Sequence, residues 1–159
     1  MTVPASWAVV SSGPFGALWL EELLRLGETP LWVVCGAPKP SGRGLKKRPL
    51  SVEEVARKAN LPLFSSPRPE EEAQRLCSEH QGSDPGASLP QVLFVVDCGR
   101  VIREPLLSLP PRGCVNLHPS LLPDLRGAAP IPRSLLRGDQ TTGTTLFRLV
   151  EAMDAGPIF

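Results

Sequence analysis

The chain has 159 residues, and its 17 lysines and arginines against 16 aspartates and glutamates leave a net charge of +1 at pH 7. Hydrophobic residues make up 42% of the sequence, a composition that excludes a collagen-like or wholly disordered chain and indicates one globular domain. A charge so close to neutral also excludes nucleic-acid binding by bulk positive charge, so any contact with RNA has to be local.

The first third of the chain predicts a strand, a helix and a second strand. Residues 7–11 form an apolar run that Ser12, Gly13 and Pro14 interrupt. Leucines then recur at helical spacing until Gly27, which predicts a helix that ends at this glycine. Residues 31–35 form a second apolar run, and residues 36–50 a loop rich in glycine, proline and basic residues.

The next elements follow from helix start signals. Ser51 and Glu54 have the spacing of a capping box, which predicts a helix over residues 51–59. Residues 63–64 are expected to form a short strand. Pro69, followed by three glutamates, predicts a second helix that ends near residue 80, and residues 81–90 are expected to be a polar linker.

The second half continues the alternation. Residues 92–96, Val-Leu-Phe-Val-Val, predict a central parallel strand that is covered on both faces. Residues 114–118 and 144–150 are expected to be strands, and residues 128–137 a helix. The whole pattern predicts an α/β fold with an open, mostly parallel, Rossmann-like sheet, whose ligand crevice lies at the carboxyl ends of the strands.

The cysteines indicate a reducing compartment. Cys35, Cys77, Cys98 and Cys114 form no C-x-x-C pair, so we expect buried free thiols and a cytoplasmic protein. A zinc site built on Cys77 and His80 lacks a second ligand pair, and no metal is expected.

Three other classes are excluded by pattern. No apolar run reaches 18 residues, so no membrane span is expected. Residues 1–20 carry no charge and lack the basic start of a secretory leader. Gly13 and Gly16 do not have the spacing of a dinucleotide fingerprint, and no phosphate-loop lysine is present, which argues against NAD and ATP.

Asn116 and His118 are the first candidate functional residues. They lie two apart at the end of a predicted strand, so their side chains share one face. An amide donor beside a group that titrates near neutral pH suits a site that stabilises an oxyanion. On these residues alone, the pattern favours the alternative of a strand-end asparagine and a structural histidine.

A longer pattern surrounds this pair. Residues 116–131, Asn-Leu-His-Pro-Ser-Leu-Leu-Pro-Asp-Leu-Arg-Gly-Ala-Ala-Pro-Ile, resemble the signature of the formyltransferases that use 10-formyltetrahydrofolate. Residues 153–157, Met-Asp-Ala-Gly-Pro, resemble the second signature of that family. The basic loop at residues 39–49 and the helix after it resemble the methionyl-tRNA branch. The resemblance covers nearly the entire chain.

The resemblance implies a sheet of the formyltransferase type and transfer of a formyl group from 10-formyltetrahydrofolate to the α-amine of methionyl initiator tRNA, for translation initiation. It implies Asn116, His118 and Asp154 as the catalytic residues. A related enzyme that acts on an amino-sugar nucleotide or on water, and a non-catalytic remnant, remain alternatives.

The resemblance also implies the binding residues. Those expected at the folate are Cys98, Gly99, Val101, Ser120, Leu121, Leu122 and Pro123. Those expected at the tRNA are Arg43, Lys46, Lys47 and Arg48, because basic side chains position phosphates without reading sequence.

The domain organisation is likewise an expectation from the resemblance. Residues 1–159 correspond to an N-terminal catalytic domain, apparently truncated at its C-terminal end and without the tRNA-binding C-terminal domain, and we expect a monomer. Two loops depart from the family pattern: residues 11–15 read Ser-Ser-Gly-Pro-Phe in place of a Gly-Thr-Pro turn, and residues 97–99 read Asp-Cys-Gly in place of Ala-Tyr-Gly. A buried Asp97 at this position would need a partner.

Overall fold

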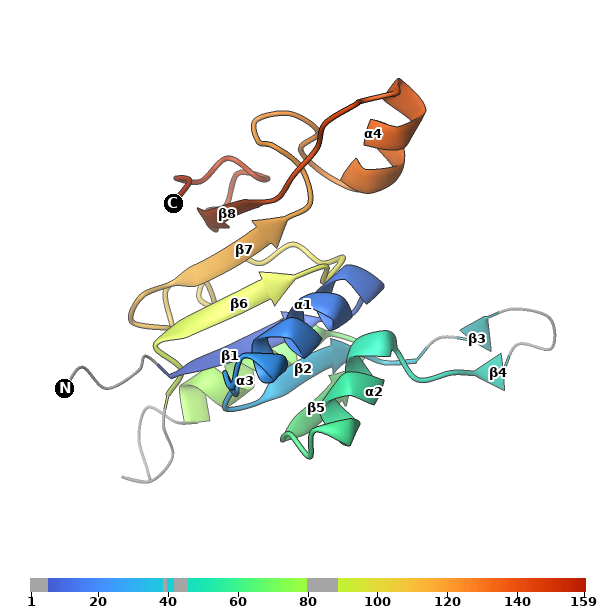
Figure 1. Cartoon of the computed structure of the whole chain (residues 1–159). Helices are drawn as coiled ribbons and strands as arrows, with labels where there is room; N and C mark the ends of the chain where they lie inside the picture. The colour runs from blue at the N-terminus through green and yellow to red at the C-terminus, as the bar shows by residue number, and fades with distance from the viewer. Residues whose placement is uncertain (1–5, 39, 42–45, 80–88) are drawn as a thin grey trace.

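Six strands form one sheet in the computed structural model, which describes residues 6–38, 40–41, 46–79 and 89–159 (Figure 1). The strands lie in the order β5-β2-β1-β6-β7-β8. Their bounds are β1 (Trp7–Ser11), β2 (Val33–Gly36), β5 (Leu63–Ser66), β6 (Val92–Val96), β7 (Cys114–His118) and β8 (Thr145–Arg148). Every neighbouring pair is parallel except β7 and β8, which confirms the expected open, mostly parallel α/β sheet.

Three helices cover the two faces of the sheet. Their bounds, with that of the fourth helix, are α1 (Pro14–Arg25), α2 (Ser51–Lys58), α3 (Pro69–Glu79) and α4 (Pro130–Arg137). Helices α1 and α2 lie on one face and α3 on the other, while α4 stands apart beyond the end of β7 (Figure 1). None of the helices in the described part of the chain is long and apolar enough to cross a membrane.

The alternation of side chains along β1 divides the core in two. Trp7 and Val9 pack with α1 and α2, whereas Ala8 and Val10 pack with α3. All four side chains are buried because β1 lies in the middle of the sheet with helices on both faces. The central position predicted for residues 92–96 is also confirmed, since β6 lies between β1 and β7.

An aromatic group fixes α1 on its face of the sheet. The ring of Trp7 lies 5.8 Å from that of Trp19 and 5.7 Å from that of Phe94, centre to centre, both nearly edge to face. Trp19 and Phe94 complete the triangle at 5.1 Å. These distances lie in the range in which aromatic pairs attract beyond their burial, so the three rings hold α1 against β1 and β6.

The predicted capping box is wrong. Ser51 is the first residue of α2 rather than its cap, and the N-cap is Leu50, which is extended at φ −73° and ψ 150°. The Leu50 carbonyl already accepts a hydrogen bond from the amide of Glu54 at 3.1 Å, so the backbone begins the first turn one residue earlier. Within α2, Glu53 rather than Glu54 is paired, at 2.8 Å from Arg57.

Two other boundaries differ from the prediction. The segment expected to be a loop contains a short antiparallel pair, β3 (Pro40–Ser41) and β4 (Lys46–Lys47). Helix α4 begins two residues later than expected, because Ala129 has a left-handed backbone at φ +57° and cannot continue a helix. The polar linker predicted at residues 81–90 lies mostly outside the described residues.

We expect the Leu20→Ala substitution to lower the free energy of unfolding by about 2–5 kcal/mol, because Leu20 is fully buried between α1 and the sheet. Leu18 on the same helix is 65% exposed and provides the matched control Leu18→Ala. Urea denaturation followed by circular dichroism measures both. Equal losses for the two variants would contradict this packing.

Candidate functional site

A cavity of about 380 Å³ lies at the carboxyl ends of β6 and β7. Four segments line it, namely residues 97–102 after β6, the end of β7, residues 127–130 before α4, and residues 149–154 after β8. Strand β8 is antiparallel and runs away from the carboxyl end of β7, and the segment after it folds back to the pocket. Asn116, His118 and Asp154 all line the cavity, so the three predicted catalytic residues are brought together.

His118 is held in one orientation by a backbone carbonyl. Its ring is 5% exposed, and Nε2 lies 3.0 Å from the carbonyl oxygen of Leu125. A carbonyl only accepts hydrogen bonds, so this contact assigns the proton of the neutral ring to Nε2. Nδ1 is then the nitrogen that can take up a proton.

The carboxylate of Asp154 lies next to that nitrogen. Asp154 Oδ2 is 3.8 Å from His118 Nδ1 and accepts a hydrogen bond from the amide of Gly127 at 2.7 Å. The separation is longer than a hydrogen bond, so a water or a small rotation is needed to join the two groups. Once His118 is protonated, the two side chains form an ion pair inside the pocket.

Asn116 provides a neutral amide on the same strand. It lies between Val95 of β6 and Phe147 of β8 in the sheet register and is half-buried. Its side chain shares a face with His118, as the spacing of two predicted. The pocket therefore combines an amide, an imidazole and a carboxylate.

The residues predicted to bind folate fall into two groups. Cys98, Gly99 and Val101 line the cavity. The other residues, Ser120, Leu121, Leu122 and Pro123, are outside the cavity lining and belong to the loop between β7 and α4.

This loop is held in place by a buried hydroxyl group of β8. Thr145 Oγ1 donates to the carbonyl of Ser120 at 2.7 Å and accepts from the amide of Leu122 at 3.0 Å. The hydroxyl of Ser120 in turn donates to the carbonyl of Asp124 at 2.7 Å. The bonds fix the loop from which the carbonyl of Leu125 reaches His118.

Sequence reasoning missed the contributions of the backbone. The Leu125 carbonyl and the Gly127 amide hold the two titratable side chains, and both residues have positive φ, +55° and +84°. The glycine at residue 127 was a signal for such a conformation. No pattern in the sequence singled out Leu125.

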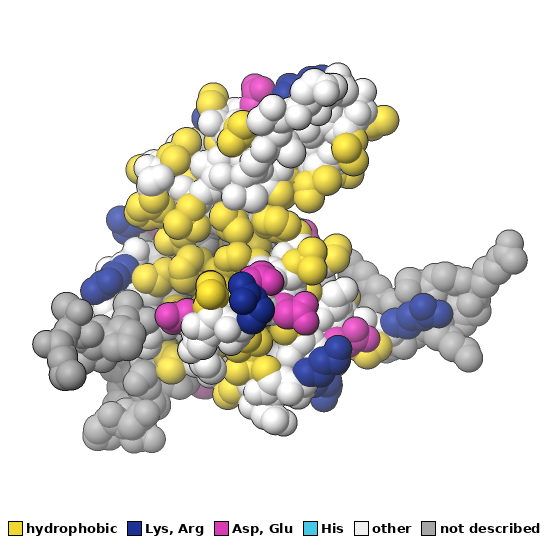
Figure 2. All heavy atoms as spheres, in the orientation of Figure 1, with side chains coloured by type: hydrophobic (Ala, Val, Ile, Leu, Met, Phe, Trp, Pro, Cys, Tyr) yellow, Lys and Arg dark blue, Asp and Glu magenta, His cyan; other side chains and the backbone are white. Residues whose placement is uncertain are grey.

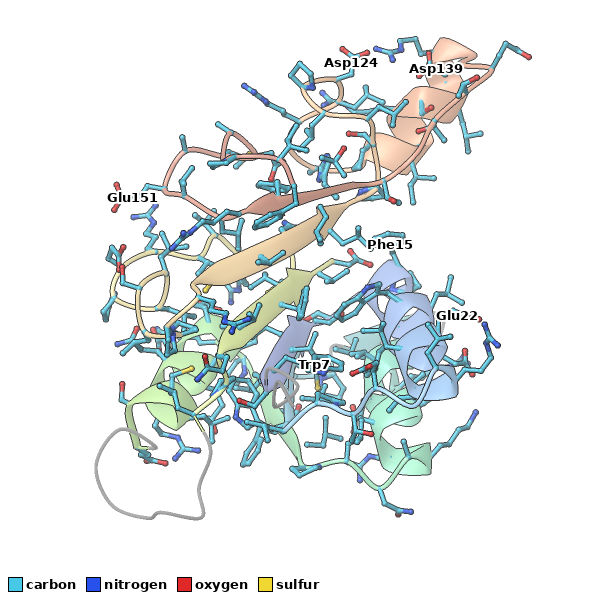
Figure 3. All side chains as sticks on the ribbon, turned by 60° about the vertical axis from the view of Figure 1, so that its left-hand side comes forward. Trp7, Phe15, Glu22, Asp124, Asp139 and Glu151 are labelled. Atoms are coloured by element: carbon cyan, nitrogen blue, oxygen red, sulfur yellow. The ribbon has the colours of Figure 1, made fainter. Side chains whose placement is uncertain are left out.

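Asp97 is exposed rather than buried, and it nevertheless has a partner. Its carboxylate Oδ2 accepts a hydrogen bond from the amide of Phe15 at 3.0 Å. Its carbonyl accepts from the amides of Ser12 and Gly13 at 3.1 and 2.9 Å. Asp97 thus links the end of β6 to the start of α1, where Phe15 lies (Figure 3).

The predicted tRNA-binding residues lie apart from the pocket. Lys46 and Lys47 form β4, and Arg48 follows it and is exposed. Strands β3 and β4 project away from the sheet on the side of α2 (Figure 1). Arg43 lies outside the described residues.

The described cysteines, Cys35, Cys77, Cys98 and Cys114, are all buried and free, as predicted. Burial raises the pKa of the Cys98 and Cys114 thiols to about 12 and that of Cys77 to about 11. Cys98 therefore lines the pocket as a neutral thiol and not as a nucleophile. Within the described ranges, no group of three or more histidine, cysteine or acidic side chains could hold a metal ion, and His80 of the hypothetical zinc pair lies outside them.

Residues 12–159 match the family model described as formyl transferase. The chain belongs to the formyl transferase family. It is 40% identical over 149 residues to the methionyl-tRNA formyltransferase of Thermotoga maritima, covering 94% of this chain and 45% of that protein. It is also 40% identical over 146 residues to the methionyl-tRNA formyltransferase of Thermus thermophilus, covering 92% and 46%. The chain thus spans about half the length of these curated relatives.

Solved structures of the family share the fold. Phosphoribosylglycinamide formyltransferase from Bacillus halodurans matches with a TM-score of 0.72 at 21% identity, over 96% of this chain and 76% of that one. Glycinamide ribonucleotide transformylase 1 from Geobacillus kaustophilus matches with a TM-score of 0.70 at 26% identity, over 98% and 79%. The sheet described above is therefore the formyltransferase sheet.

The raised thiol pKa values predict both reactivity and pH dependence. Burial raises the pKa of the Cys98 thiol to about 12, so at pH 8 iodoacetamide should label the native chain far more slowly than the chain in urea. The folded state holds the protons of the Cys98 and Cys114 thiols more tightly than the unfolded state does. The free energy of unfolding should therefore fall as the pH rises above about 9, the ordinary pKa of a thiol. Rapid labelling of the native chain at pH 8 would contradict the burial of these thiols.

Proposed function

We propose that this pocket transfers a formyl group from 10-formyltetrahydrofolate to the α-amine of methionyl initiator tRNA, in the cytoplasm. The observation that carries the proposal is the meeting of Asn116, His118 and Asp154 in one cavity of a formyl transferase domain. The acceptor is inferred from the relatives named methionyl-tRNA formyltransferase.

Asn116 stabilises the charge that develops on the formyl oxygen. The nitrogen lone pair of the amine attacks the formyl carbon, the carbon–oxygen double bond becomes an oxyanion, and the bond to N10 of the folate then breaks. A fixed amide donor aimed at this oxygen lowers the barrier without reorganising. No bond to the protein forms at any step.

His118 and Asp154 accept and stabilise the proton that the attacking amine releases. The attacking amine releases a proton, and Nδ1 of His118 is the ring nitrogen able to accept it, because Nε2–H is held by Leu125. Asp154 stabilises the resulting imidazolium from 3.8 Å, directly or through a water. The same proton passes to N10 of the folate as it leaves, so the residues return to their starting state.

The cavity suits the reacting end of a folate. Its volume of about 380 Å³ lies within the range of small-molecule sites, and apolar side chains and the backbone of Gly99 line it. Cys98, Gly99 and Val101 contact the ligand in this proposal. Residues 120–123 contribute by holding the loop that orients His118.

The Asn116→Ala substitution should lower kcat by about 100- to 1000-fold, the usual cost of removing one oxyanion donor, with little loss of stability. The assay follows a labelled formyl group from 10-formyltetrahydrofolate to initiator methionyl-tRNA. Gln140→Ala removes an exposed amide outside the cavity lining and is the control.

The position of the label separates the alternatives. Label on the tRNA that is lost in the Asn116 variant supports the proposal. Label released as formate would instead indicate a deformylase. Label that stays on the folate would contradict turnover by this chain.

We further propose that the segment containing Arg43, Lys46, Lys47 and Arg48 contacts tRNA phosphates. A triple variant, Lys46→Ala, Lys47→Ala and Arg48→Ala, should weaken tRNA binding and reduce the slope of log K against log salt by roughly 2 to 3, because each phosphate contact contributes about 0.7 to 0.9.

The control removes the same charge from other exposed positions, Arg25, Lys58 and Arg112, each replaced by alanine. Filter binding at several salt concentrations measures the slope. Equal slopes in the two triple variants would show that the segment has no special role.

A further inference from the structure

The carboxylate of Asp97 is a second fixed negative charge at the pocket, separate from Asp154. It lines the cavity, is exposed, and is held by the amide of Phe15 through Oδ2. Gly13 leaves room for it, since a Cβ on Gly13 would lie 2.0 Å from Asp97 Oδ2. Among the described residues, no backbone amide donates to Oδ1, so Oδ1 can accept from a ligand.

Asp97 occupies the position that an external anion would otherwise favour. Helix α1 has 12 residues and begins at the pocket end of β1, and its N-cap is a glycine without a capping side chain. The free amides of a helix N-terminus attract phosphates and carboxylates. Here the protein's own carboxylate takes the amide of Phe15, so a phosphate approaching this end of the crevice meets a like charge.

The charged side chains around the cavity also favour a cationic ligand over an anionic one. The carboxylates that line it are Asp97, Glu151 and Asp154. Arg100 also lines it, but its guanidinium donates to the carbonyl of Pro67 at 2.8 Å and lies 3.8 Å from Glu70. Fixed negative charge therefore exceeds fixed positive charge in the described lining, which favours a cationic ligand.

We propose that Asp97 is a specificity-determining residue that binds the acceptor as its α-ammonium ion and disfavours acceptors with a phosphate near the amine. This inference rests on the proposed function for the identity of the amine. The bound ammonium loses one proton to water before its lone pair attacks the formyl carbon. Asp97 thus acts on acceptor binding, while Asn116 and His118 act on the chemistry.

The test distinguishes the effect of the Asp97 charge from the effect of its hydrogen bond to Phe15. Asp97→Asn keeps an oxygen that can accept from the amide of Phe15 but removes the charge. Glu21→Gln removes one exposed carboxylate from α1 away from the cavity lining and is the matched control. The probes are methionine methyl ester, which carries the α-ammonium, and N-formylmethionine methyl ester, which is uncharged. Chemical-shift titration of the full chain gives each Kd without requiring turnover.

We expect the cationic ester to bind the unmodified chain and the Glu21 variant about tenfold more tightly than it binds Asp97→Asn. The uncharged ester should bind all three equally. In addition, inorganic phosphate should bind Asp97→Ala more tightly than the unmodified chain, because the amide of Phe15 is then free.

Equal affinity of the cationic ester for the unmodified chain and Asp97→Asn would overturn the inference, as would equal phosphate binding by the unmodified chain and Asp97→Ala. These titrations are independent of formyl transfer. If the ester depends on Asp97 but no label reaches the tRNA, the proposed function fails and the amine site stands. If label is transferred to the tRNA and the affinity for the ester does not depend on Asp97, the proposed function stands and the amine site at Asp97 fails.

Discussion

The hydrogen bond between His118 Nε2 and the Leu125 carbonyl determines how the site can work. It decides which ring nitrogen carries the proton in the neutral form and leaves Nδ1 facing Asp154. The bond exists because the loop after β7 turns back on itself, and that turn is held by Thr145 from the neighbouring strand. The chemistry of these side chains thus depends on backbone groups, such as the Leu125 carbonyl, that cannot be recognised from a sequence motif.

The sheet topology supplies the rest of the arrangement. Parallel β6 and β7 end at the same edge, which brings residues 97–102 beside Asn116 and His118. The antiparallel β8 carries the chain away from this edge, and the segment after β8 folds back so that Asp154 reaches the same cavity. The N-terminus of α1 also lies at this site, because the amide of Phe15 donates a hydrogen bond to Asp97.

Much of this could be predicted from the sequence. The apolar runs at residues 7–11 and 92–96 gave the central strands correctly, because a strand covered on both faces has a continuous apolar pattern. The spacing of Asn116 and His118 predicted their common face, and the two signatures predicted that Asp154 would join them.

The failures have a common physical origin. The capping box at Ser51 failed because the Leu50 carbonyl began the helix first, and the partner of Asp97 was not predicted because it is an amide 82 positions away. The carbonyl of Leu125 could not be foreseen for the same reason. Backbone groups are present at every residue, so a sequence carries no mark of which one will be used.

The surface beside the site exposes hydrophobic side chains. Hydrophobic side chains are visible over β7 and β8 next to α1 (Figure 2), and Leu146 and Ile158 are 37% and 55% exposed. The β8 edge of the sheet is therefore less shielded from water than the buried centre of the sheet at β1. Local opening is expected to begin at this edge.

Left-handed backbone recurs around the pocket. Asp97, Leu125, Ala129 and Asp154 all have positive φ, a conformation that costs a residue other than glycine of order 1 kcal/mol. A single-base change can turn an aspartate codon into a glycine codon, and glycine would relieve this strain while deleting the carboxylate. The same change would also leave the amides of Phe15 and Gly127 without their partners, so the strained backbone is retained together with the contacts that these carboxylates make.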